Sequence, residues 1–373
     1  MVELVDTTDL KSVGSNTMRV RFPLSAHMTT RRHWIMLMSG CIGLLLLVVV
    51  GWVIWSQRVC CAPTPTFITS TALADEELDA KITELTAVLD TQSPSVALAQ
   101  LRAEVQASDE LARSCHLIAH ELGHAAYDKY QDFTVAIQYQ DEICNSGYLH
   151  GVIESHFASS DDVFDAMTTV CGTTSATTYA GWECYHGVGH GLMYYTENDL
   201  PKALELCDQY AEVEARNSCA NGVFMENFNT DQDTHPSNYL SDEDLFYPCA
   251  EQTAHQGDCY FYAPTHYLAA HPNDYLGALD WCTTLDGDAK FSCTRGAGNE
   301  TMKQNVNHPE LVTSICHKAS FDQVEPCIQG MASLAVFHYG DLSKAYQSCT
   351  QLSMTDKTIC AKTVDSFSTL FTQ

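Results

Sequence analysis

Hydrophobic positions along most of this chain recur at the spacing of an α-helix. Residues 275–282 carry apolar side chains at helical intervals, the polar segment 286–288 interrupts them, and residues 291–302 resume the pattern. Apolar side chains at every third or fourth position mark one face of a helix, whereas clustered Asp and Gly mark a turn. The pattern predicts pairs of helices joined by short turns, and so an all-α fold.

One segment is hydrophobic without interruption. Residues 34–55 hold no charged side chain, and 22 residues rising about 1.5 Å each span the hydrocarbon core of a bilayer. Four arginines precede this segment and only Arg58 follows it closely, which by the positive-inside rule places the N-terminus in the cytoplasm. The alternative is a cleaved signal peptide, but the run is long for one and no A-x-A site follows it.

These features divide the chain into four segments. We expect a cytoplasmic segment at 1–33, a transmembrane anchor at 34–55, a stalk at 56–74 and an extracytoplasmic repeat domain at 75–373. The first 27 residues lack periodicity and look like the translation of a tRNA gene upstream of a prokaryotic reading frame, which makes Met28 an alternative start. The expected protein is a single-pass membrane protein of a prokaryotic cell envelope, with its C-terminal domain periplasmic or extracellular.

The charge of the chain excludes one class of partner. Asp and Glu number 47 against 19 Lys and Arg, a net charge of -28, and residues 62–373 alone hold 44 acidic and 13 basic residues. Nucleic acid would meet a field of its own sign, so nucleic-acid binding is not expected. The sequence also has no Walker loop, dinucleotide fingerprint, G-x-S-x-G elbow or C-x-x-C-H haem site.

Cysteines give the chain its most regular pattern. There are 17, and no C-x-x-C pair of the kind that binds metal, so disulfides in an oxidising compartment are the better interpretation. Twelve fall into six closely spaced pairs: Cys171/Cys184, Cys207/Cys219, Cys249/Cys259, Cys282/Cys293, Cys316/Cys327 and Cys349/Cys360. A cysteine ending one helix and another early in the next would face each other across the turn, at a distance that a disulfide can bridge.

The second cysteines of these pairs also measure a repeat. They recur at intervals of 35, 40, 34, 34 and 33 residues, the period of a helix-turn-helix solenoid. Cys144 and Cys115 extend the register backwards and pair with each other, which gives eight units from near Ser93 to the C-terminus. We therefore predict an α-solenoid of about eight repeats of about 34 residues. The alternative is a globular, disulfide-rich domain without repeats.

A glycine three residues after the cysteine recurs in five of the eight units. Because Gly in a helix costs about 1 kcal/mol relative to Ala, its recurrence predicts close contacts between neighbouring helices. The period and the cysteine pairing resemble those of cysteine-rich tetratricopeptide-like repeat proteins, over roughly residues 93–370. The resemblance implies a disulfide in each antiparallel helix pair and a concave surface that faces a partner. The sequence does not show the usual tetratricopeptide consensus residues.

Seven of the 16 histidines lie between residues 116 and 190, in the second helices of the first three units. His120/His124, His150/Glu154 and His186/His190 are spaced i, i+4, so each pair projects from one helix face and can converge on one ion. We expect zinc, or another transition metal such as copper, nickel or iron. The candidate ligands are His116, His120, His124, His150, Glu154, His156, His186 and His190.

Residues 120–124 also match H-E-x-x-H, the zincin signature, in which the glutamate polarises a zinc-bound water. This similarity names Glu121 as a candidate catalytic base and Glu142, His150 or Glu154 as a third ligand. A zincin normally has a strand beside its substrate cleft, which a helical solenoid lacks. The structural alternative for all these histidines is hydrogen bonding within tightly packed helices.

The positions six and seven residues after the second cysteine form a column along the repeats. Beyond the third unit this column stays largely polar but loses most of its histidines. Glu226, His266 and Glu300 belong to it, and they either extend a groove from the metal cluster or are ordinary solvated residues. Nearby tyrosines could line a peptide or glycan groove, or fill helix interfaces. Three functions stay open: a repeat scaffold that binds a transition metal and an unknown protein, peptide or glycan partner; a zinc-dependent hydrolase; and a metal-free interaction module.

Overall fold

The computed structural model describes residues 72–230 and 235–372, which belong to one compact unit, Phe67–Gln373. All regular structure in these ranges is helical, with 16 α-helices and three short 3-10 helices. The predicted membrane anchor, the cytoplasmic segment and most of the stalk lie outside the described residues. Within the described ranges, no helix has the length and apolar character to cross a bilayer.

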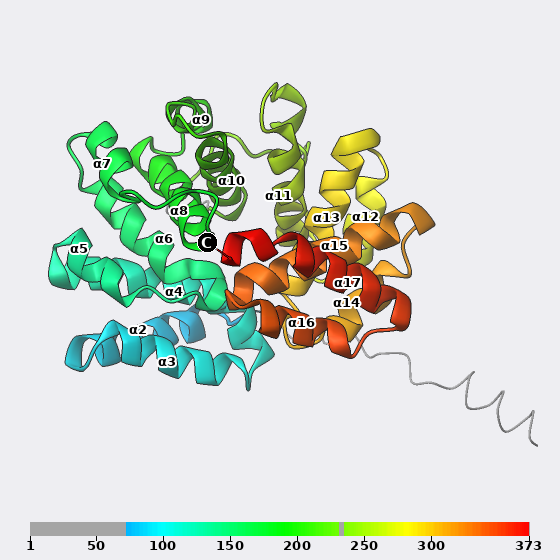
Figure 1. The fold of residues 1–373 in the computed structure, drawn as a ribbon, viewed down its shortest axis with the longest axis horizontal. Helices are drawn as coiled ribbons and strands as arrows, with labels where there is room; N and C mark the ends of the chain where they lie inside the picture. The colour runs from blue at the N-terminus through cyan, green and yellow to red at the C-terminus, as the bar shows by residue number, and fades with distance from the viewer. Residues whose placement is uncertain (1–71, 231–234, 373) are drawn as a thin grey trace, which may run out of the picture. The chain divides into compact units, whose positions relative to one another are not determined.

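The helices follow one another in short and long pairs (Figure 1). Their bounds are α2 Asp75–Thr91, α3 Pro94–Val105, α4 Asp109–Tyr130, α5 Phe133–Ala136, α6 Ile143–Ala158, α7 Val163–Thr169, α8 Tyr179–Tyr195, α9 Leu200–Cys207, α10 Val213–Asn229, α11 Gln256–Ala270, α12 Tyr275–Cys282, α13 Gly287–Lys303, α14 Pro309–Cys316, α15 Phe321–Tyr339, α16 Leu342–Thr350 and α17 Met354–Ser366. The 3-10 helices are η1 Ile137–Tyr139, η2 Cys249–Glu251 and η3 Ser368–Phe371.

Six disulfides lie within a unit and join its second helix to the segment that precedes the turn, as the cysteine spacing predicts, and the seventh, Cys115–Cys144, joins α4 to α6 of the next unit. All seven expected bridges are present, with Cα–Cα distances of 5.3–5.7 Å. The eight second helices are α4, α6, α8, α10, α11, α13, α15 and α17, and each carries one second-position cysteine. One unit departs from the pattern, because its first helix is reduced to the 3-10 helix η2.

Local sequence sets where the helices begin. Ser93, Ser108 and Thr178 precede α3, α4 and α8, and each side chain accepts a hydrogen bond from a backbone N–H of the first turn. Asp199 and Asp341 do the same for α9 and α16. Such caps satisfy N–H groups that have no partner inside the helix, and each contributes about 1 kcal/mol.

Consecutive second helices pack against one another along the chain, from α4 to α6, α8, α10, α11, α13, α15 and α17. The recurrent glycines lie where these helices meet, as predicted. A Cβ at Gly222 would overlap the backbone carbonyl of His186, and one at Gly330 would overlap that of Arg295. The sequence therefore specifies a row of long helices in close backbone contact.

The row does not stay open. Helix α15 of the seventh unit contacts α6 of the second, and the ring of Phe371 stacks on Tyr179 of α8 at 4.6 Å (Figure 1). On another side, Asp109 at the start of α4 contacts His308 Nε2 at 3.0 Å. The paired-helix arrangement is thus confirmed, but the late units pack against the early ones, which the repeat period alone does not predict.

Candidate metal centre

The histidine cluster forms because α4, α6 and α8 approach one another at glycines. A Cβ at Gly151 of α6 would overlap the carbonyl oxygen of His120 of α4, and one at Gly147 would lie 2.7 Å from the carbonyl oxygen of His116. A Cβ at Gly187 of α8 would lie 3.2 Å from the His150 ring. With the backbones this close, side chains beside each glycine share one space between the helices.

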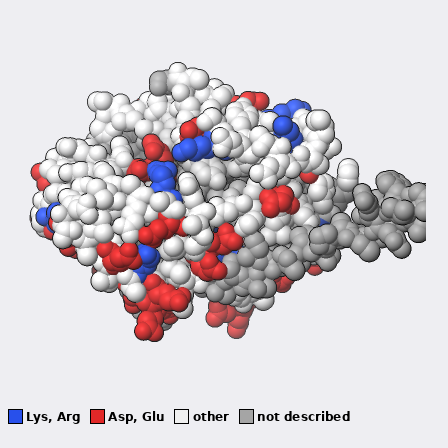
Figure 2. Space-filling model, turned by 90° about the horizontal axis from the view of Figure 1, so that it is seen from below, with Lys and Arg blue, Asp and Glu red and all other residues white. Residues whose placement is uncertain are grey.

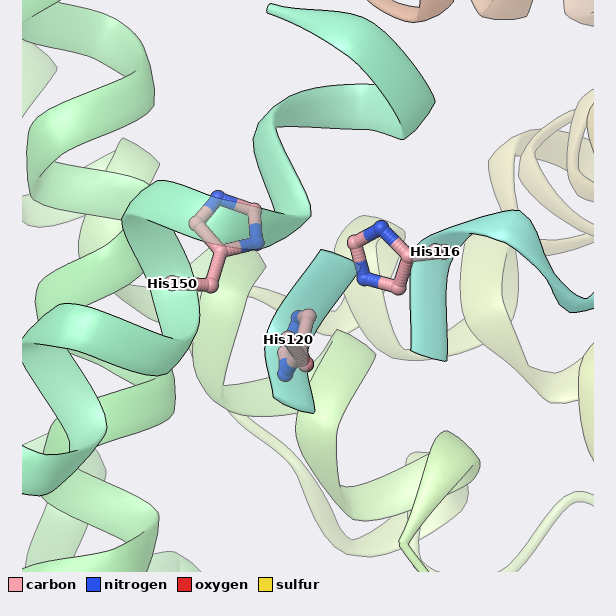
Figure 3. Close-up of side chains that lie close together, drawn as sticks. All are labelled: His116, His120 and His150. Carbon is pink, nitrogen blue, oxygen red and sulfur yellow. The ribbon is translucent and has the colours of Figure 1, made fainter. Parts of the chain in front are cut away.

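Five imidazoles enter that space, and a sixth, His124 of α4, lies beside it. His116 and His120 come from α4, and His150 comes from α6; their rings lie around a common space in Figure 3, with ring centres 4.4–5.6 Å apart. The ring of His190 from α8 stacks on that of His150 at 4.6 Å, and His186 lies 5.1 Å from His150. The sequence prediction that residues 120, 150 and 190 lie near one another is therefore confirmed.

Glu154 lies at the centre of three of these histidines and is fully buried. Its Oε2 is 2.7 Å from Nε2 of His124, and its Oε1 is 3.2 Å from Nδ1 of His120 and 3.5 Å from Nδ1 of His190. Burial alone would raise the pKa of this carboxyl group. The electrostatic interaction with His120 and hydrogen bonds from the surrounding imidazoles outweigh burial and hold the pKa well below its usual range, so the group is a carboxylate.

The histidines divide into two electrostatic classes. Burial, reinforced by neighbouring imidazoles, holds the pKa of His116, His150 and His186 well below the usual value, so these rings are neutral. Burial also opposes the charge of His124 and His190, but Glu121 and Glu154 raise the pKa of His124 to about 10, and Glu154 and Glu226 raise that of His190 to about 9. A neutral imidazole offers a nitrogen lone pair, which is what a metal ion binds, so His190 must release one proton when an ion binds to it.

Several polar atoms in the cluster are buried without a hydrogen-bond partner among the described residues. Among the histidines, they are both ring nitrogens of His150, Nε2 of His120 and Nδ1 of His186. His116 differs, because its Nδ1 donates to the carbonyl oxygen of Cys144 at 2.7 Å and leaves Nε2 as the lone-pair nitrogen. A backbone carbonyl that fixes the second nitrogen of an imidazole is a common feature of metal-binding histidines.

Three overlapping sets of side chains could hold an ion. Within each set the ligand atoms lie within 4.8 Å of one another: His116, His120 and His150; His150, His186 and His190; and His120, Glu154 and His190. In the second set, the Nε2 atoms of His186 and His190 are 3.2 Å apart. Two zinc–nitrogen bonds of about 2.0–2.1 Å at a tetrahedral angle place their nitrogens about 3.3 Å apart, so this pair has the spacing that zinc requires.

Three predicted residues belong to none of these sets. One is His124, which lies beside them with its Nε2 against Glu154. His156 shares α6 with His150, but its ring packs 4.7 Å from Phe133 and its Nδ1 is 3.4 Å from the hydroxyl of Tyr127. The side chain of Glu121 is 40% exposed and contacts the cluster only at Nδ1 of His124, at 3.7 Å. The carboxylate at the centre of the cluster is therefore Glu154, whereas Glu121 lies at its edge.

Three side chains join the cluster beyond the predicted set. Glu226 of α10 is 2.8 Å from Nδ1 of His190, and Sδ of the adjacent Met225 is 3.2 Å from Nε2 of His186. Glu183 is buried, with Oε2 3.7 Å from Nε2 of His150, and burial raises its pKa to about 7. Glu226 belongs to the predicted polar column, whereas Glu183 directly precedes a cysteine and has no i, i+4 ligand partner that would have marked it.

The polar column leads from the cluster into a central cavity of about 590 Å³. Met225, Thr265 and Glu300 line this cavity, together with Trp182, whose ring stacks on His186 at 4.9 Å. His266 does not line it and instead lies 3.4 Å from the carbonyl oxygen of Ser241. Met225 and Trp182 therefore separate the histidine cluster from the cavity.

Comparisons with known proteins give no relative for this chain. No protein-family profile, curated protein or solved structure matches it.

Proposed function

We propose that this protein is an extracytoplasmic repeat protein that binds a transition-metal ion, preferably zinc, among the histidines of its first three units. The observation that carries the proposal is the set formed by His150, His186 and His190. Two of its nitrogens have the spacing of zinc ligands, and the third ring is buried with both nitrogens unpartnered. A bound ion would give these atoms the partners that the protein does not supply.

The energetic argument favours a metal over a purely structural cluster. An unsatisfied buried polar atom costs about 1–3 kcal/mol, and four imidazole nitrogens are in that position. A hydrogen-bonded packing cluster would pair these atoms instead. Glu226 on His190 and the Cys144 carbonyl on His116 further correspond to the outer partners that orient metal-binding imidazoles.

The donor atoms favour zinc. Neutral imidazole with carboxylate is a common zinc ligand set, and both are present here. The thioether of Met225, 3.2 Å from Nε2 of His186, adds a soft donor of the kind that binds copper. Copper is therefore the ion to compare with zinc.

The seven disulfides suggest an oxidising, extracytoplasmic compartment for this domain. We further propose that residues 34–55 anchor it in the membrane of a prokaryotic cell envelope, and that the array is a tetratricopeptide-like solenoid. The surplus of carboxylates on the surface in Figure 2 suits the attraction of cations to the domain.

Binding is favoured over hydrolysis. A hydrolytic zinc needs an open coordination position and a base directed at its water. Here His150, His186, His190 and Glu154 are each no more than 1% exposed, and Glu121 lies at the edge of the cluster. An ion this deeply buried, with Glu121 at the edge of the cluster, suits structure or recognition.

Metal analysis of the full-length protein, purified without chelator, tests the proposal directly. We expect close to one zinc or copper per chain, and less than about 0.1 metal per chain after incubation with both ions would refute it. His150→Asn and His190→Asn should each weaken zinc binding at least about tenfold. His156→Asn is the matched control, because it removes an imidazole from the same helix and should keep full affinity.

The hydrolase alternative has its own test. If Glu121 were the base, Glu121→Gln would abolish turnover of peptide or ester substrates while zinc stayed bound. We expect no zinc-dependent turnover in the wild type and unchanged zinc affinity in Glu121→Gln. Zinc-dependent hydrolysis that disappears in this variant would replace binding with catalysis as the function.

A further inference from the structure

The central cavity has the properties of a second binding site, separate from the metal cluster. Its volume of about 590 Å³ is within the usual range of small-molecule sites, about 300–1,000 Å³. Its walls come from the second helices α6, α8, α10, α11, α13, α15 and α17, together with η3. Helices stapled by disulfides therefore form its walls.

The charges on its walls balance. Asp258 and Glu300 are acidic, Arg295 and Lys303 are basic, and all four line the cavity. Glu300 lies 3.7 Å from Lys303, and the charge of Asp258 acts on Arg295. In a chain with a net charge of -28, this balanced wall is a local exception, and it favours neither an anion nor a cation.

The cavity walls also carry hydrogen-bonding groups beside these charged side chains. Tyr262 donates to Asn221, and Asn221 donates to Asp258, both at 2.8 Å. On the next helix, Nε of Arg295 is buried and has no hydrogen-bond partner among the described residues, while its Nη2 donates to Ser333 at 3.3 Å. A ligand that supplies an acceptor to Arg295 and donors to Asp258 would satisfy the hydrogen-bonding capacity of both side chains.

Aromatic rings occupy the rest of the wall. Trp182 packs against Phe337 at 4.4 Å, and both line the cavity. Phe261 lies under the guanidinium group of Arg295, and Phe367 contacts Phe337 at 5.2 Å. Aromatic faces beside amide, carboxylate and guanidinium groups suit a ligand with apolar C–H faces and a polar rim of hydroxyl groups.

We propose that the central cavity binds a neutral carbohydrate, a short oligosaccharide or a terminal sugar of a glycan. Hydroxyl groups act as donors and acceptors at once, so they can satisfy Asp258, Asn221 and Arg295 together, and sugar rings stack on aromatic faces. An apolar ligand would leave the charged groups unsatisfied, and a charged ligand would upset their balance. The proposal does not depend on the metal, because no histidine of the cluster lines the cavity.

Calorimetric titration of the full-length protein tests the proposal. The probes are cellotriose, maltotriose, mannotriose and chitotriose, with glutamate and inorganic phosphate as charged comparisons. We expect saturable binding of at least one trisaccharide and a change in the fluorescence of Trp182. No binding of any of the four, or tighter binding of glutamate or phosphate, would overturn the proposal.

Variants locate the binding in the cavity. Asp258→Asn keeps the shape of the side chain and Asn299→Ala removes a cavity amide, and each should weaken the trisaccharide at least about tenfold. Asp288→Asn, an exposed position on the same helix as Asn299, is the control and should bind like wild type. His150→Asn should lose metal but keep the sugar, which separates failure of this proposal from failure of the metal proposal. Equal binding by Asp258→Asn, Asn299→Ala and wild type would place the sugar elsewhere.

Discussion

The contact between α4 and α6 at Gly151 should control both stability and metal affinity. Gly151→Ala puts a methyl group where the carbonyl oxygen of His120 lies, so the helices must separate locally by roughly 1 Å. Overpacking of this kind costs about 1–3 kcal/mol, and the higher helix propensity of Ala returns about 1 kcal/mol. We expect a net loss of up to about 2 kcal/mol, which lowers the melting temperature by a few degrees.

The effect on the metal should be larger than the effect on stability. Metal–ligand distances tolerate about 0.2 Å, so a separation of roughly 1 Å between His120 and His150 disrupts any set that spans both helices. Metal binding by the set His150, His186 and His190 should also weaken, because Gly151 directly follows His150. Zinc affinity, measured by competition with a chromophoric chelator, should fall at least about tenfold in Gly151→Ala.

Gly330→Ala is the matched control. Its methyl group would overlap the carbonyl oxygen of Arg295, so it makes an equivalent clash between α13 and α15, where there is no histidine cluster. It should lose similar stability and keep its zinc, and it should weaken sugar binding because Arg295 and Ser333 line the cavity. Wild-type zinc affinity in Gly151→Ala, or an equal loss in both variants, would refute the argument that glycine contacts position the ligands.

Three further predictions concern stability. Burial, with Arg102 and Lys344 nearby, lowers the pKa of His338 to about 4, whereas the pKa in the unfolded chain is about 6.5. The contribution of His338 to stability is therefore complete above pH 6.5, and the free energy of unfolding falls by at most about 3 kcal/mol towards pH 4. His338→Asn should reduce this loss in urea titrations. Removing the Cys115–Cys144 bridge, which spans 29 residues, should cost about 0.8 kcal/mol more than removing Cys316–Cys327, which spans 11, and equal losses would contradict the loop-entropy argument. Asp109→Asn weakens the contact with His308, and amide exchange in α14 should become faster while exchange in α10 stays unchanged.

The sequence predicts the helix pairs because the cysteines record them directly. A disulfide requires Cα atoms about 4.4–6.8 Å apart, so a spacing of 10–13 residues around a turn fixes which helices pair. Among the described residues no disulfide joins α6 to α15, so the cysteine spacing does not predict that contact. Closure of the row depends on small rotations between successive units, and these accumulate from side-chain packing that a repeat period does not contain.

Residue spacing likewise predicts only part of the candidate site. His120, His150 and His190 could be placed together because each occupies nearly the same position after its cysteine, and adjacent second helices are in register. His156 is only two residues beyond Glu154, but that offset turns its side chain to another face of α6, where Phe133 packs on it. Candidate ligands in a repeat protein are therefore better chosen by their column in the repeat than by their density in the sequence.

One position of the repeat holds different residue types in the early and the late units. The position six residues after the second cysteine is His150 in α6 and His190 in α8, whereas in α10, α11, α13 and α15 it is Met225, Thr265, Asn299 and Ser333, which line the central cavity. In α6 and α8 the column is enclosed by neighbouring helices, and its imidazoles face one another. In the later units the same column lines the cavity. The metal site and the sugar site that we propose therefore differ in the residue type that this column carries.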